Sequence, residues 1–334
     1  MPVSKSRIAI LLTLFFLAVA GHSRAQERDD LPIKVRTYLV HIPVIASDRD
    51  GRYVSGLKKE DFSIFEDGTK QEISFFADEK EPMNVVILID TSFSTRAVLD
   101  DIKKAARDFV RVFRLEDKGM IASFDFEMKV LQEFTSDQKQ LSKAINKTSI
   151  GARPGSNMQD SVYALVKKQL TEVKGRKAII VLTDGEVGGS VVSDETLINT
   201  LAESDVLVYT IIFQTPSSYA AYRVPESIKS RNGVTISGKG LIGRLEEVRL
   251  ERFQFMSSLG AVTGGRLLDS KAGDFRGSFQ VIADELKNQY LIGFYPRNPD
   301  DEKPHNVVVE TSLKDTVLRS KRNIVLKLNK RENN

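Results

Sequence analysis

The chain has 334 residues, with 49 Lys and Arg, 45 Asp and Glu, three His, and neither Cys nor Trp. Hydrophobic residues make up 41% and charged residues 28%, which is typical of a globular protein and excludes a fibrous or largely disordered one. The length predicts about two domains of ordinary size. Because cysteine is absent, disulfides, thiolate zinc sites, iron–sulfur clusters and cysteine nucleophiles are all excluded.

Residues 1–25 have the composition of a secretory signal peptide. Lys5 and Arg7 precede a 13-residue apolar run, and small residues close the segment at Ala25. The run is shorter than the roughly 20 residues that a membrane-spanning helix needs, so an uncleaved anchor is only the alternative. We therefore expect an exported protein, secreted or periplasmic, that is cleaved near Ala25 or Ala20 and then has no integral membrane span.

The basic character of the chain belongs largely to this leader. The formal net charge is +4, but Lys5, Arg7 and Arg24 lie in the leader together with no acidic residue. Removing these three leaves 46 basic against 45 acidic residues. A nearly neutral chain has no electrostatic attraction for nucleic acid, so we expect no nucleic-acid partner.

Two segments of β character flank a central region. The N-terminal segment, residues 26–83, begins with alternating apolar and polar residues and contains Asp67 and Gly68, a strong hairpin signal. Residues 290–330 return to β character at the other end of the chain. Neither flank has enough strands to form a stable core alone, so we predict that the two pack together as one small β domain.

Residues 84–289 alternate between strands and helices, which predicts a doubly wound, mostly parallel α/β sheet. Continuous apolar runs such as residues 85–89 predict strands that are covered on both faces. Residues 120–124 and 129–134 are joined so tightly that an antiparallel pair is expected. Residues 214–248 predict a long connection, which is either functional or an unstructured insertion.

Three predicted loops carry oxygen ligands at the carboxyl ends of strands. Asp90, Ser92 and Ser94 follow the first strand of the central region, Ser156 precedes a helix, and Asp184 ends a later strand. A doubly wound sheet places its site at that edge. Hydroxyls with few carboxylates suit Mg²⁺, or Mn²⁺, so we predict a divalent metal site there. Taken singly, the same residues are explained by helix caps and turns.

The central region resembles the von Willebrand factor type A domain with its metal-ion-dependent adhesion site, MIDAS. The pattern Asp-x-Ser-x-Ser that starts at Asp90, the Gly-Ser pair that ends at Ser156, and Leu-Thr-Asp-Gly around Asp184 are similar to the three metal loops of that family. The resemblance covers about residues 84–285, with serine at 156 where the family usually has threonine. It implies that the metal is held by Asp90, Ser92 and Ser94. It further implies that Ser156 and Asp184 contribute directly or through water.

The flanks resemble those of secreted bacterial von Willebrand type A-related proteins. The N-terminal flank contains the pattern Gly-Leu, Asp-Phe and Asp-Gly that is typical of the group, and the C-terminal flank begins with a similar strand. The residues that carry the first resemblance are Gly56, Leu57, Asp61, Phe62, Asp67 and Gly68.

The resemblance implies an exported binding module in which a carboxylate of a partner protein completes the coordination of Mg²⁺. Residues 214–248 leave the same sheet edge and would help to select that partner. A hydrolase or phosphoryl-transfer enzyme is one alternative, but the sequence has neither a phosphate loop nor a usable serine–histidine arrangement, so no catalytic residue is assigned. A metal-free scaffold is the other alternative. The sequence does not identify the partner-binding residues or the oligomeric state.

Overall fold

The computed structural model describes residues 39–186, 188–215, 227–229, 235–270, 274–297 and 303–325. The predicted signal peptide, residues 1–25, lies outside these ranges. Contacts between residues group Tyr38–Asn334 into one unit. Within the described residues, no helix is long and apolar enough to cross a membrane.

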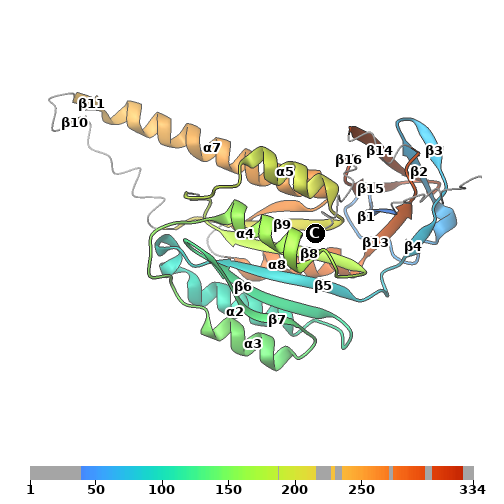
Figure 1. Cartoon of the computed structure of the whole chain (residues 1–334), viewed down its shortest axis with the longest axis horizontal. Coiled ribbons are helices and arrows are strands. Elements are labelled where there is room, and N and C mark those ends of the chain that lie inside the picture. The colour runs from blue at the N-terminus through green and yellow to red at the C-terminus, as the bar shows by residue number, and fades with distance from the viewer. Residues whose placement is uncertain are drawn as a thin grey trace, which may run out of the picture. The chain divides into compact units, whose positions relative to one another are not determined.

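A six-stranded sheet forms the centre of the structure, with the strand order β12-β9-β8-β5-β6-β7 (Figure 1). All neighbouring strands are parallel except β6 and β7, which are antiparallel. The predicted α/β sheet is therefore confirmed, together with its antiparallel pair. The strands are β5 (Met83–Asp90), β6 (Lys118–Phe124), β7 (Met128–Thr135), β8 (Arg176–Thr183), β9 (Val206–Phe213) and β12 (Arg266–Ser270).

Helices cover both faces of this sheet and create two core layers. On β5, Val85, Ile87 and Ile89 face one layer, whereas Val86 and Leu88 face the other, because side chains alternate along a strand. The first layer is covered by α2 (Leu99–Val110), α3 (Gln138–Lys147) and α8 (Phe275–Lys287). The second is covered by α4 (Met158–Ala164), its π-helical continuation η3 (Leu165–Gln169), α5 (Asp194–Glu203) and α7 (Gly238–Thr263).

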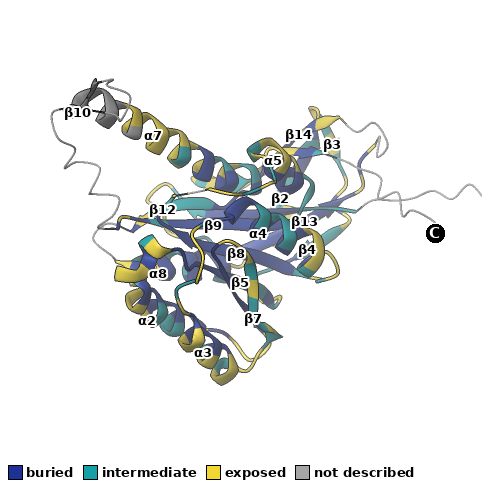
Figure 2. Cartoon of the chain, turned by 60° about the vertical axis from the view of Figure 1, so that its left-hand side comes forward, coloured by how far each residue is buried: buried dark blue, intermediate teal, exposed yellow. Residues whose placement is uncertain are grey.

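The connection predicted for residues 214–248 lies partly outside the described residues and differs where it is described. β10 (Ser227–Lys229) pairs with β11 (Thr235–Ser237), and α7 begins at Gly238 rather than after residue 248. Residues 246–250 of this helix are exposed (Figure 2). The second half of α7 is fixed by burial of Phe255, Met256 and Leu259 in the core. The helix extends from this packed half back to Gly238 despite the low helix propensity of glycine.

The two flanks form two four-stranded antiparallel sheets, which confirms the predicted small β domain. Their strand orders are β15-β1-β13-β4 and β16-β14-β2-β3, so each sheet joins strands from both ends of the chain. Ile42, Ile64, Tyr290 and Val307 are buried in their common core. The strands are β1 (Val40–Asp48), β2 (Phe62–Glu66), β3 (Thr69–Gln71), β4 (Phe75–Ala77), β13 (Gln289–Phe294), β14 (Pro304–Thr311), β15 (Thr316–Ser320) and β16 (Asn323–Val325).

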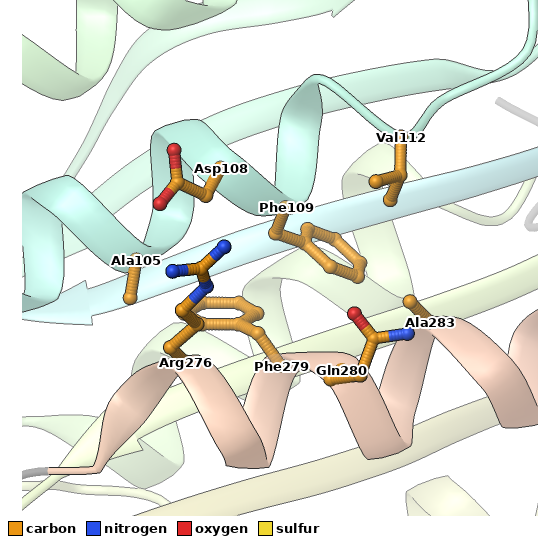
Figure 3. Close-up of a pocket in the computed structure, with 8 residues that line it drawn as sticks. All are labelled: Ala105, Asp108, Phe109, Val112, Arg276, Phe279, Gln280 and Ala283. Atoms are coloured by element: carbon orange, nitrogen blue, oxygen red, sulfur yellow. The ribbon is translucent and has the colours of Figure 1, made fainter.

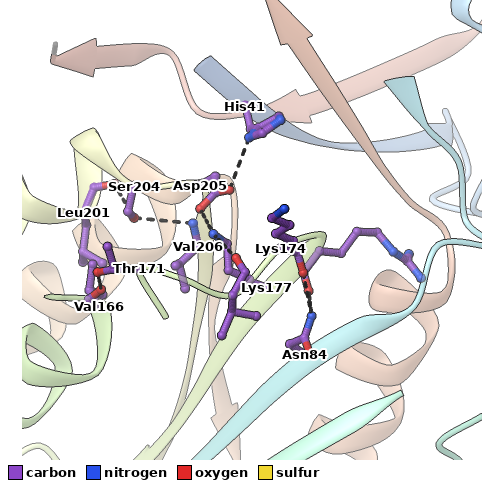
Figure 4. Close-up of polar contacts among 12 residues, drawn as sticks. His41, Asn84, Val166, Thr171, Lys174, Lys177, Leu201, Ser204, Asp205 and Val206 are labelled. Carbon is purple, nitrogen blue, oxygen red and sulfur yellow. Dashed lines mark hydrogen bonds and ion pairs between the residues drawn. The ribbon is translucent and has the colours of Figure 1, made fainter. Parts of the chain in front are cut away.

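Buried polar groups connect the β domain to the α/β core (Figure 4). The Asp205 carboxylate lies 2.7 Å from Nζ of Lys177 and 3.5 Å from Nδ1 of His41, which belongs to β1. Lys321, between β15 and β16, donates a 2.7 Å hydrogen bond to the carbonyl of Ser204, the residue that caps the end of α5. Desolvation lowers the pKa of Lys321 to about 8. The ammonium satisfies a carbonyl that a helix end leaves without an internal partner.

Arg176 makes a second connection through its buried guanidinium. This residue begins β8 and donates hydrogen bonds to the carbonyls of Leu286 (2.7 Å) and Gln289 (3.2 Å), where α8 leads into β13. It also donates a 2.7 Å bond to the carbonyl of Glu81, just before β5. Burial lowers the pKa of Arg176 to about 10, because desolvation disfavours the charged form. One side chain therefore satisfies three carbonyls at the two junctions where the chain passes between the β domain and the α/β core.

We expect Arg176→Met to lower the free energy of unfolding by about 3 kcal/mol, because it leaves several buried carbonyls without donors. Urea denaturation followed by circular dichroism measures this loss. Lys118→Met, at the exposed start of β6, is the matched control and should change stability by less than about 0.5 kcal/mol. Equal effects of the two substitutions would contradict the role of Arg176.

Candidate metal site

Asp90 is the centre of the candidate site. It ends β5, and its side chain is fully buried. One carboxylate oxygen, Oδ1, accepts a 2.8 Å hydrogen bond from the N–H of Ser92. The other, Oδ2, accepts bonds from the hydroxyls of Thr183 (2.8 Å) and Ser156 (3.3 Å). A single carboxylate therefore joins three loops of the sheet edge.

The turn after β5 gathers hydroxyl groups beside this carboxylate. The Oγ atoms of Ser92 and Ser94 lie 3.1 Å apart, and Oγ of Ser92 lies 3.4 Å from Oγ1 of Thr95. The backbone forms a 3₁₀ helix over η2 (Phe93–Ala97), which tightens the chain immediately after the strand. The two predicted serine ligands are thus adjacent to each other and to Asp90.

Asp184 lies where β8 ends and is also buried. Its Oδ1 accepts a 3.1 Å hydrogen bond from the N–H of Glu186, and its Oδ2 accepts a 3.3 Å bond from the hydroxyl of Thr215, beyond β9. The next residue, Gly185, has a φ of 82°, a conformation that favours glycine and turns the chain away from the strand. The structure thus brings all five residues singled out in the sequence to one edge of the sheet.

Two buried residues at this edge were missed by the sequence analysis. Thr183 donates a hydrogen bond to Asp90. The sequence pattern that could have indicated this role is a hydroxyl residue at the last position of a buried strand. Asp125 directly follows β6, and its Oδ2 lies 3.4 Å from the hydroxyl of Thr91. A Cβ atom on Gly151 would lie 2.1 Å from that same Oδ2, so only glycine fits beside the carboxylate. The signal for Asp125 was an acidic residue at a strand end, the same pattern that singled out Asp90.

Burial makes the negative charge of the two carboxylates unfavourable. Desolvation, together with Coulombic repulsion from Asp184, raises the pKa of Asp90 to about 6. Desolvation also raises the pKa of Asp184, an effect that the Ser94 hydroxyl opposes. Within the described ranges, neither carboxylate has an ion pair with Lys, Arg or His. Two buried carboxylates therefore share one cluster of hydroxyls without a compensating side-chain cation.

This set of donors fits a hard divalent cation. The described residues contain no group of three or more His, Cys, Asp or Glu that could hold a metal, so the site depends on its hydroxyls. Hydroxyl and carboxylate oxygens are suitable ligands for Mg²⁺ or Mn²⁺, which retain water in the remaining positions.

A shallow cavity elsewhere in the core is separate from these residues (Figure 3). It lies between α2 and α8 and has a volume of about 100 Å³. Its floor is apolar, with the rings of Phe109 and Phe279, and its rim carries Asp108 and Arg276. None of the predicted metal ligands lines it.

In the metal-free protein, we expect Asp90 to make the free energy of unfolding fall as the pH rises from about 4 to about 6. The pKa of Asp90 is about 6 in the folded state and has an ordinary value of 3.8, so the folded state binds more protons in this window. The stability present below pH 4 is lost as the carboxyl ionises. Urea denaturation in EDTA should show this slope in the wild type but not in Asp90→Asn. Asp100→Asn, exposed on α2, should keep it; a wild-type minus Asp90→Asn difference that is constant with pH would contradict the assignment.

Comparison with known proteins finds a family match within the central region. Residues 85–186, which include all five predicted ligands, match the family model of the von Willebrand factor type A domain. A search of curated proteins gave no significant match.

Solved structures with a similar chain trace include two proteins of Bacteroides. One is an aerotolerance-related membrane protein from Bacteroides fragilis with multiple mutations to serines (16% identity, TM-score 0.44, 61% of this chain and 98% of that chain). Another is the conserved hypothetical protein BatB from Bacteroides thetaiotaomicron (18% identity, TM-score 0.41, 62% and 100%). A third is proximal thread matrix protein 1 from the mussel byssus, with a zinc-occupied MIDAS motif (12% identity, TM-score 0.48, 66% and 49%).

Proposed function

We propose that the α/β region, of which residues 85–186 match the von Willebrand factor type A domain, binds another protein in a metal-dependent manner. The observation that carries the proposal is the pair of buried carboxylates, Asp90 and Asp184, which are joined by serine and threonine hydroxyls and have no cationic side-chain partner among the described residues. A divalent ion relieves the repulsion between these carboxylates and occupies a set of donors that suits it.

Each residue of the site has a separate part in this proposal. The ligands would be Asp90, Ser92, Ser94, Ser156 and Asp184, with Mg²⁺ or Mn²⁺ as the ion. Thr183 and Thr215 orient the two carboxylates through hydrogen bonds of 2.8 and 3.3 Å. When bound, the ion supplies a positive centre that attracts a carboxylate. Because the serine ligands are neutral, a third carboxylate, supplied by an acidic residue of a partner protein, is a natural further ligand.

Binding rather than catalysis is proposed because, among the described residues, no histidine lies in the cluster around Asp90 to act as a general base. Of the histidines in the described residues, His41 contacts Asp205 and His305 contacts Asp67 and Glu66, all outside the cluster around Asp90. The surrounding side chains are hydroxyls and carboxylates that hydrogen bond to one another. We also propose that the protein is exported to the periplasm or beyond, because residues 1–25 have the composition of a signal peptide.

Metal binding is tested by calorimetry and thermal unfolding with Mg²⁺ and Mn²⁺. We expect each ion to bind with measurable heat and to raise the melting temperature of the wild type, because an ion that binds only the folded state stabilises it. Asp90→Asn and Ser156→Ala should each weaken binding about tenfold or more. Asp100→Asn is the control and should bind like the wild type. Neither heat nor a shift with either ion in the wild type would overturn the proposal.

Partner binding is tested by affinity capture from the envelope fraction of the source cell. We expect a protein to be retained in Mg²⁺, released by EDTA, and absent when Asp90→Asn is the bait. Alanine substitution of the acidic residues of the retained protein should identify one carboxylate on which retention depends. Retention that persists in EDTA or with Asp90→Asn would show that the contact lies elsewhere.

A further inference from the structure

We propose that two exposed phenylalanine–arginine pairs at the edge of the candidate metal site select the partner. The pairs are Phe93 with Arg96 and Phe126 with Arg153, and the partner segment that fits them carries apolar side chains next to its acidic residue. This inference rests on the proposed function and adds the chemical class of the partner to it.

The first pair is built into the turn that carries the serine ligands. Phe93 lies between Ser92 and Ser94 in the sequence, yet it is 47% exposed while Ser92 is buried. The guanidinium carbon of Arg96 lies 6.0 Å from the centroid of its ring. The chain therefore directs two hydroxyls toward Asp90 and leaves the intervening aromatic ring in solvent.

The second pair lies beside the loop that carries Ser156. Phe126, in the turn between β6 and β7, is 46% exposed, and the guanidinium carbon of Arg153 lies 5.7 Å from its ring centroid. A Cβ atom on Gly155 would lie 3.3 Å from both Cα and Cδ2 of Phe126, so this ring packs directly against the residue before Ser156. Glycine at 155 has no side chain that could cover the ring.

Asn157 fixes the backbone that carries the second ring relative to the site. Its side-chain amide donates a 2.7 Å hydrogen bond to the carbonyl of Phe126, and its backbone N–H donates a 2.8 Å bond to the carbonyl of Asp125. Because Asn157 follows Ser156, the β6–β7 turn and the ligand loop form one hydrogen-bonded unit. Because this backbone is already held in place, it loses little conformational entropy when a partner binds.

The two arginines remain available to a partner. In the part of the chain that the structure describes, neither Arg96 nor Arg153 has an ion pair. Arg96 contacts the ring of Phe93, and Arg153 contacts the ring of Phe126. The nearby Lys129, in contrast, is engaged by Asp125 and Glu127, at 3.8 and 3.7 Å. A guanidinium stacked on a ring keeps N–H donors at its edge, which can bond to a carboxylate or carbonyl of the partner.

The chemistry of these pairs defines the segment that they recognise. A carboxylate alone would engage the metal and leave both rings exposed to water. Apolar side chains beside that carboxylate bury the ring faces, while the arginines favour a segment of negative charge. Aromatic and arginine side chains are also the residue types that most often dominate the energy of protein interfaces.

Selection from a displayed library of random peptides, with the full chain as bait, tests this inference. In Mg²⁺, the wild type should enrich sequences in which Asp or Glu is flanked by Leu, Ile, Val or Phe, and EDTA should abolish the enrichment. For the strongest selected peptide, the double variant Phe93→Ser/Phe126→Ser should lose about tenfold or more in affinity. Arg96→Gln/Arg153→Gln should weaken binding about threefold and reduce its salt dependence.

Two controls separate this inference from the proposed function. Tyr295→Ser and Arg49→Gln, exposed in the β domain, should select like the wild type. Calorimetry with Mg²⁺ should give wild-type metal affinity for the phenylalanine and the arginine double variants, because none of these side chains is a predicted ligand. If the phenylalanine double variant enriches the same acidic peptides as the wild type, and EDTA abolishes this enrichment in both, the role of the phenylalanine–arginine pairs would be overturned while the proposed function would stand. A wild type that enriches no acidic sequence in Mg²⁺ would overturn both proposals.

Discussion

A carboxylate buried as completely as that of Asp90 needs polar partners, and this requirement organises the whole metal edge of the domain. Its partners come from its own turn, from the end of β8 and from the loop before α4. They meet because parallel strands end at the same edge of the sheet and because both faces of that sheet are covered by helices. The site is therefore a consequence of the sheet topology and needs no loop of unusual length.

Asp184 makes this requirement stricter, because a second buried carboxylate repels the first. The raised pKa values of both groups express the electrostatic penalty. Hydroxyls can hydrogen bond to the carboxylates but cannot neutralise them. This uncompensated negative charge is the reason for our proposal that the edge binds a small divalent cation.

The central sheet and the convergence of the five candidate ligands could be predicted from the sequence because their signals are local. Continuous apolar runs mark buried strands, and an oxygen-bearing residue directly after such a run must lie at the sheet edge. Asp125 was missed because the same pattern was read there as a tight turn. The start of α7 was missed because Gly238, Gly240 and Gly243 have low helix propensity and favour a loop. That the flanks pair was predictable, but their registers were not, since strands at opposite ends of the chain share no local pattern.

The pairing of β1 with β13 and of β2 with β14 imposes an order on the making of this protein. As the chain is synthesised, β2 can pair at once with β3, but β1 and the other edge of β2 gain their strand partners only after the entire α/β core has followed them. Unpaired strand edges are templates for aggregation, so these edges need protection during this interval. A chain that stops before β13 retains the loops of the candidate site but leaves β1 and one edge of β2 without strand partners. The β domain can therefore form all its strand pairs only after the C-terminal strands have been synthesised.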